Sequence, residues 1–79
     1  MGSLEDYRKQ LDEIDREIVR LYEQRMQVSE EVAGFKIANG RTVLDRQREQ
    51  EKLRTVESMV RGERNRLGAR ELFEQLMSS

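Results

Sequence analysis

The stretch that decides the fold is residues 4–38, LEDYRKQLDEIDREIVRLYEQRMQVSEEVAGFKIA, which lacks proline and carries apolar side chains at helical spacing. The apolar positions are Leu4, Tyr7, Leu11, Ile14, Ile18, Leu21, Val28, Val32 and Phe35. Steps of three and four residues place these side chains, called the seam below, along one face of a helix. Ser3 is a suitable N-cap, and Asn39-Gly40 is a suitable helix stop. We therefore predict one helix from about residue 4 to about residue 38.

A helix of this length is long for a chain of 79 residues. At about 1.5 Å per residue it would extend about 50 Å. A compact globule of the same chain length has a radius of gyration of only about 12 Å. Much of the seam would stay exposed unless a partner chain covers it. Homodimerisation is the simplest arrangement, because a two-fold axis lets each long helix pack on its copy.

Two shorter helices are predicted after Gly40. Asp45 is a good N-cap for a helix at about residues 45–61, and a polar stretch then leads to a third helix at about residues 67–77. The apolar positions are Leu53, Val56 and Val60 in the second helix and Leu72, Phe73, Leu76 and Met77 in the third. The sequence therefore predicts one all-α domain over residues 1–79, with a three-helix protomer.

The composition excludes several classes of function. Lys and Arg number 15 against 16 Asp and Glu, so the net charge of −1 leaves no basic excess for nucleic-acid binding. The chain has no Cys and no His, which removes disulfides, thiolate metal sites and the usual general base. No apolar run approaches the roughly 20 residues that span a bilayer, and no signal peptide opens the chain. We expect a cytoplasmic protein with no metal, cofactor, nucleic-acid or membrane partner.

Two cations depart from the apolar pattern of the first helix. Arg25 occupies the step between Leu21 and Val28, and Lys36 projects from nearly the same face three turns later, at about 3.6 residues per turn. Two cations beside apolar residues can form an anion-binding groove. The ordinary interpretations stay open: a snorkelling or register-setting Arg, and a solvated Lys near a helix C-terminus.

Arg8 and Glu49 are further candidates. Arg8 lies beside the seam, too far along the helix axis to meet Arg25 of its own chain. An antiparallel partner chain can bring it there. The ordinary interpretation of Arg8 is a solvated surface residue. Glu49 lies one turn before Leu53 on the apolar stripe of the second helix, where it is either a site residue or the ion-pair partner of an Arg. The ordinary interpretations of Asp45 and Arg48 are a cap and a first-turn residue.

This set of residues suits one kind of chemistry. Nucleophilic and metal-assisted mechanisms lack their usual side chains here. Cations and one carboxylate in a sheltered groove can hold a polyanionic substrate in a reactive shape and stabilise charge that develops in its transition state. A unimolecular rearrangement fits, because it needs no proton shuttle and no covalent intermediate. The spacing alone indicates only a dianion site.

At this point the sequence resembles the all-helical class of chorismate mutases. The match is carried by four ordered segments, RKQLDEID at 8–15, QRM at 24–26, VAGFK at 32–36 and VLDRQRE at 43–49. The last is similar to the family's Val-x-Asp-x-x-Arg-Glu. The resemblance covers about residues 4–60, and the segment LFEQL at 72–76 is similar to the start of the family's third helix.

The resemblance implies an intertwined homodimer whose two active sites each use both chains. It implies the Claisen rearrangement of chorismate to prephenate, on the route to phenylalanine and tyrosine. Arg25 and Arg8 of the partner subunit would bind the two substrate carboxylates, and Lys36 would reach the ether oxygen. Glu49, with the backbone around Asp45, would hold the ring hydroxyl, and Arg48 would support the carboxylate end.

One departure from the family concerns the third helix, which normally continues and supplies a Ser and a Gln or Glu to the site. The present sequence ends at Ser79, before those positions. Either the molecule is shortened, or the sequence is part of a longer chain. We expect the 79-residue form to be weakly active or inactive, and less stable or differently packed. Two alternatives to an enzyme stay open: a non-catalytic helical dimerisation module, and a mutase-like domain that binds aromatic metabolites without turnover.

Overall fold

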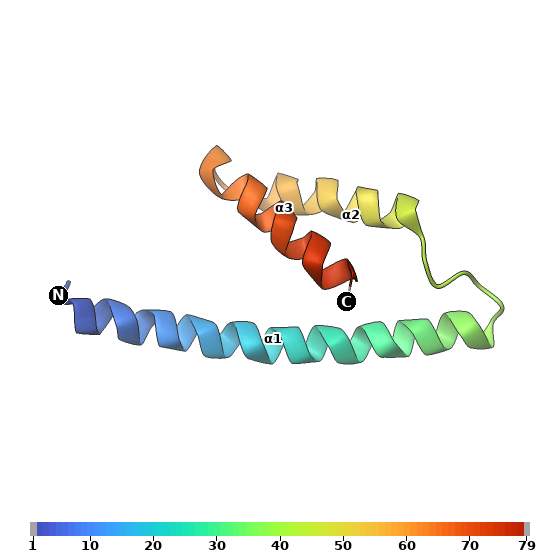
Figure 1. Cartoon of the computed structure of the whole chain (residues 1–79), viewed down its shortest axis with the longest axis horizontal. Helices are drawn as coiled ribbons and strands as arrows, with labels where there is room; N and C mark the ends of the chain where they lie inside the picture. The colour runs from blue at the N-terminus through green and yellow to red at the C-terminus, as the bar shows by residue number, and fades with distance from the viewer. Residues whose placement is uncertain (1, 79) are drawn as a thin grey trace. The chain divides into compact units, whose positions relative to one another are not determined.

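The computed structural model describes residues 2–78, and within them the chain forms three helices and no strand (Figure 1). These are α1 (Leu4–Ala38), α2 (Arg46–Met59) and α3 (Glu63–Ser78). The predicted all-α fold is confirmed. The chain divides into two compact units between Val43 and Leu44, one containing α1 and the other containing α2 and α3.

α1 is a single unbroken helix with a local cap at each end (Figure 1). The Oγ atom of Ser3 accepts a hydrogen bond from the backbone N–H of Asp6 at 3.0 Å, as the N-cap prediction required. At the other end, the side-chain amide of Asn39 donates to the carbonyl oxygen of Phe35 at 2.8 Å. Gly40 follows with a φ of +64°, the left-handed conformation that glycine adopts without a steric penalty. These caps explain why the helix has the bounds that the sequence indicated.

The seam of α1 has no core of its own. None of the residues of α1 is buried, and its seam side chains are about half exposed, from 46% for Val32 to 64% for Leu4. In water such a stripe loses the burial energy that normally stabilises an amphipathic helix. Burial of the seam against another surface would supply this energy.

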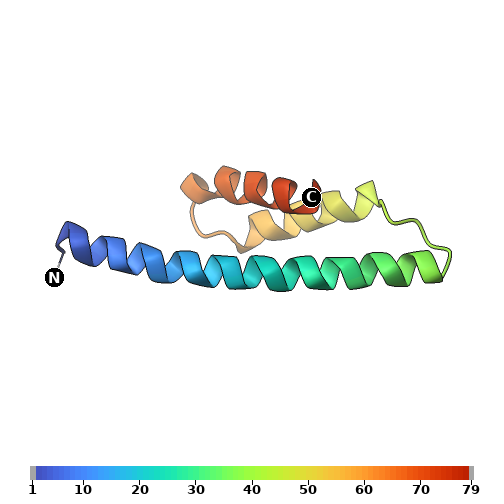
Figure 2. The same cartoon turned by 60° about the horizontal axis from the view of Figure 1, so that its bottom comes forward.

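α2 and α3 form a helical hairpin and lie side by side in both views (Figures 1 and 2). Leu53 and Val56 of α2, exposed by 3% and 4%, are the only buried residues in the part of the chain that the structure describes. Phe73 and Leu76 of α3 are half-buried. The apolar stripes predicted for the two helices therefore supply the small core of this unit.

The turn between α2 and α3 is shorter than the sequence indicated. α2 ends at Met59 because Val60 has an extended backbone, and Gly62 has a φ of +88°. α3 then begins at Glu63 rather than near residue 67. Its polar first turn is helical, with an acid near the helix N-terminus and an ion pair between Glu63 and Arg66. Because this first turn has no apolar side chains, the apolar periodicity of the sequence could not indicate that α3 begins there.

Candidate functional site

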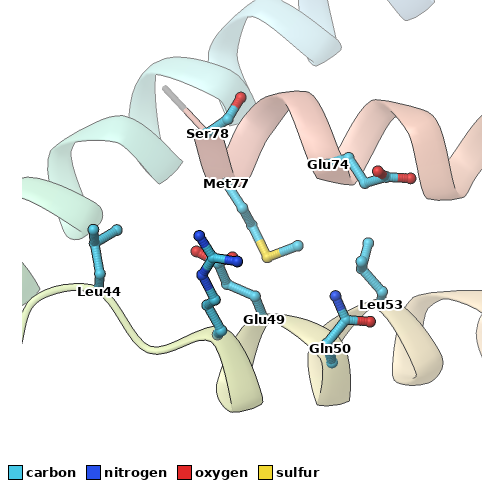
Figure 3. Close-up of a pocket in the computed structure, with 8 residues that line it drawn as sticks. Leu44, Glu49, Gln50, Leu53, Glu74, Met77 and Ser78 are labelled. Atoms are coloured by element: carbon cyan, nitrogen blue, oxygen red, sulfur yellow. The ribbon is translucent and has the colours of Figure 1, made fainter.

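The hairpin contains an open pocket between the first turns of α2 and the last turns of α3 (Figure 3). Its volume is about 470 Å³. The pocket is lined by Leu44, Arg46, Glu49, Gln50, Leu53, Glu74, Met77 and Ser78. Figure 3 shows Met77 extending from α3 toward α2, and Leu53 extending from α2 toward α3. Of the predicted site residues, Glu49 is the one in this wall, and we call the cavity the Glu49 pocket.

The position of Glu49 follows from the way α2 begins. The Asp45 carboxylate accepts a hydrogen bond from the backbone N–H of Arg48 at 3.0 Å, and the Asp45 carbonyl accepts one from the N–H of Glu49 at 3.1 Å. This cap starts the helix at Arg46 and puts Glu49 one turn before the buried Leu53. Glu49 is half-buried, whereas Asp45 and Arg48 are exposed. The carboxylate therefore lies on the apolar stripe, as the sequence indicated.

The cations of α1 differ in their burial. Arg25 and Lys36 are half-buried, while Arg8 is exposed. The Nζ atom of Lys36 donates to the backbone carbonyl of Val43 at 3.4 Å. Lys36 is therefore not the fully solvated residue of its ordinary interpretation. Arg8 and Arg25 lie on the same helix about 25 Å apart along its axis at about 1.5 Å per residue, so they cannot meet within one chain.

An ion-pair cluster, which the sequence interpretation missed, lies beside the pocket. Arg70 of α3 bonds to Glu57 of α2 through Nη1 at 2.9 Å and pairs with Glu74 through Nε at 3.3 Å. The hydrogen bond that the Arg70 guanidinium donates to the Glu57 carboxylate raises the pKa of Arg70 above its ordinary value, and Glu74 adds to the effect. The spacing of Arg70 and Glu74, four residues apart on one helix, was a signal that could have found half of this cluster.

Other residues of the pocket wall were also missed. Met77 was assigned to the apolar face of the third helix, and it also lines the Glu49 pocket. Arg46, Gln50 and Ser78 also line the pocket, and their place in the wall depends on how α3 packs against α2. The chemistry available to the wall is the binding of polar and charged groups, with apolar contact from Leu53 and Met77.

Residues 2–78 contain neither a candidate metal site nor a candidate membrane-spanning helix. The described residues contain no group of three or more His, Cys, Asp or Glu side chains that could hold a metal ion. None of the helices in the same range is both long and apolar enough to cross a membrane.

Comparison with known proteins identifies the family. No curated protein and no solved structure matches the chain. A family model described as chorismate mutase type II matches residues 7–79, which include both units of the structure. The match includes the segments that carried the resemblance and adds the rest of α3. Together with the all-helical fold, it shows that this chain belongs to the chorismate mutase type II family.

Proposed function

We propose that this protein is an isomerase that converts chorismate to prephenate in the synthesis of phenylalanine and tyrosine. Membership of the chorismate mutase type II family, over residues 7–79, is the observation that carries the proposal. It is supported by Arg25, Lys36 and Glu49, which are charged but half-buried, as side chains that line an anion site would be.

The proposed reaction is a unimolecular Claisen rearrangement, in which the ether C–O bond breaks as a new C–C bond forms. The protein has to hold the substrate in a compact shape and stabilise the negative charge that grows on the ether oxygen. Arg25 and Arg8 of the partner subunit bind the two carboxylates. The Lys36 ammonium donates to the ether oxygen, and this contact strengthens as the bond breaks, so it lowers the barrier rather than only tightening binding.

The α2 residues act on the other end of the substrate. Glu49 accepts a hydrogen bond from the ring hydroxyl, with the backbone around Asp45 beside it. Support for this role comes from the position of Glu49 in a pocket wall that also offers apolar contact from Leu53 and Met77. Arg48 supports the carboxylate end. No cofactor enters this mechanism.

We propose a homodimer as the working form. The helices of the hairpin have 14 and 16 residues and are about 21 and 24 Å long, whereas α1 has 35 residues and is about 52 Å long. The hairpin of the same chain is therefore too short to cover the whole seam. A second α1 has both the length and the complementary apolar face. Light scattering tests this form: the dimer mass is expected, and a monomer that persists at high concentration contradicts it.

The activity is tested by following chorismate disappearance by absorbance, beside calorimetric binding of a bicyclic dicarboxylate that mimics the transition state. The unaltered chain is expected to bind the mimic and to convert chorismate to prephenate at a low rate, as predicted for the 79-residue form. The absorbance assay measures this rate. Lys36→Ala is expected to lower kcat about 10²–10³-fold, because it removes a donor to the developing oxyanion.

The matched control is Lys9→Ala, which removes an exposed ammonium from the opposite face of α1 and is expected to leave kcat within about twofold. Equal losses in the two variants would contradict the role given to Lys36. An unaltered chain that folds and dimerises but neither binds the mimic nor consumes chorismate would support the non-catalytic dimerisation module instead.

A further inference from the structure

The wall of the Glu49 pocket has an unfavourable charge for the substrate proposed above. Its charged residues are Arg46, Glu49 and Glu74, so one guanidinium faces two carboxylates. Glu49 has a role in binding the ring hydroxyl, but Glu74 has none. A dicarboxylate that enters such a pocket is repelled by any carboxylate whose charge is not offset.

Arg70, which is not among the residues that line the pocket, supplies a positive charge that offsets the charge of Glu74. Its Nε atom lies 3.3 Å from Oε1 of Glu74, on the same helix. The guanidinium is itself fixed from the other side, since Nη1 bonds to Oε1 of Glu57 on α2 at 2.9 Å. The side chains of Arg70 and Glu57 are 33% and 29% exposed, so this bond is sheltered compared with the surface pair Arg66–Glu63.

The two ion pairs of Arg70 therefore have separable effects. The pair with Glu57 joins α2 to α3 and acts on the stability of the hairpin. The pair with Glu74 acts on the charge of the pocket wall, because Glu74 lines the pocket and Glu57 does not. Removal of Arg70 affects both, but only the second effect is reversed by neutralising Glu74.

We propose that Arg70 is a positioning residue, which holds the Glu74 carboxylate and offsets its charge so that the Glu49 pocket admits a dianionic substrate. This inference rests on the proposed function, because it takes the substrate to be a dicarboxylate. Arg70 touches neither the substrate nor the reacting atoms in this account. Its influence is on binding, through the field that Glu74 presents to the pocket.

The test is a charge ladder at positions 70 and 74, read as the KM for chorismate and the Kd of the bicyclic dicarboxylate mimic. The unaltered pair has a formal charge of 0, Arg70→Gln has −1, Glu74→Gln has +1, and the double variant returns to 0. Arg70→Gln is expected to raise both constants about fivefold to tenfold with kcat within about twofold, and the increase should shrink at high salt. Glu74→Gln is expected to lower them about twofold, and the double variant to restore them to within about twofold of the unaltered protein.

Glu57→Gln combined with Arg70→Gln separates the binding effect from a structural one. It neutralises an acid outside the pocket wall and is expected to leave KM as high as in Arg70→Gln alone. Arg66→Gln, which breaks a surface pair away from the pocket, is the control and is expected to leave both constants unchanged. If Glu74→Gln fails to restore binding in the Arg70→Gln background, Arg70 only braces the hairpin and the inference is overturned.

Two further outcomes are decisive. If circular dichroism shows that Arg70→Gln does not fold, the test depends on Glu74→Gln alone. An unchanged or raised Kd of the mimic for Glu74→Gln then contradicts the inference. If the unaltered protein neither turns over chorismate nor binds the mimic, the proposed function fails and the inference falls with it. Normal turnover and binding with an unchanged KM in Arg70→Gln overturns the inference alone.

Discussion

Leu53→Ala should weaken the α2–α3 hairpin more than any substitution of an exposed leucine. Leu53 is 3% exposed, and it shares the small core of the hairpin with Val56. The substitution removes three carbon atoms, and at about 0.8 kcal/mol for each buried methylene the lost transfer free energy is about 2.4 kcal/mol. Because Leu53 also lines the Glu49 pocket, the vacated space opens to an existing cavity, and water can enter it. The cavity penalty should therefore be small, and we expect a total loss of about 2–3 kcal/mol.

The assay is urea unfolding followed by far-UV circular dichroism, with all variants at one protein concentration because the proposed dimerisation would couple stability to concentration. Leu67→Ala is the matched control: it makes the same change of side chain within a helix, at a position that is 64% exposed. It should alter the free energy of unfolding by no more than about 0.5 kcal/mol. Equal losses for Leu53→Ala and Leu67→Ala would refute the reasoning, since the hairpin core would then not be centred on Leu53.

Two further predictions concern the backbone around the site. Gly40→Ala should destabilise the protein by about 1 kcal/mol because the φ of Gly40 is +64°. Gly34→Ala should instead stabilise it by about 0.5–1 kcal/mol, because Gly34 lies within α1 and the added Cβ would have nothing within 4 Å. Thermal unfolding of both variants tests these opposite signs, and two shifts of the same sign would contradict the account. Asp45→Ala should lower the free energy of unfolding by about 1 kcal/mol through loss of the α2 cap. Asp45→Asn keeps an oxygen acceptor for the Arg48 N–H and should lower it by only about a few tenths of a kcal/mol. Equal losses in urea unfolding would show that capping is not what Asp45 contributes.

The sequence predicted α1 well because all of its signals are local. The seam repeats over 35 residues, Ser3 caps one end, and Asn39-Gly40 closes the other, so no information about distant residues was needed. The start of α3 was not predictable in this way. Glu63 to Arg66 is polar, and its helicity depends on a turn at Gly62 and on local charge pairing rather than on an apolar face.

The candidate site shows the same division. Glu49 could be predicted because a carboxylate at an apolar position breaks the helical periodicity of the sequence. The burial of Leu53 confirms that this face of α2 is the apolar one. Arg70, Glu74 and Met77 were missed as site residues because their importance depends on how α3 packs against α2. The bond between Arg70 and Glu57 joins residues thirteen positions apart in two helices, and no helical periodicity marks such a pair.

The central claim is that the charged residues of α1 form a dianion site shared between two copies of the chain. It is tested most directly by mixing Arg8→Ala and Arg25→Ala chains, unfolding and refolding them together, and measuring chorismate turnover. Random pairing makes about half of the dimers mixed, and each mixed dimer has one of its two sites intact, so about one quarter of the unaltered activity should return. Each variant refolded alone should have almost none. A mixture no more active than its separate components, at a concentration where dimers form, would contradict the claim.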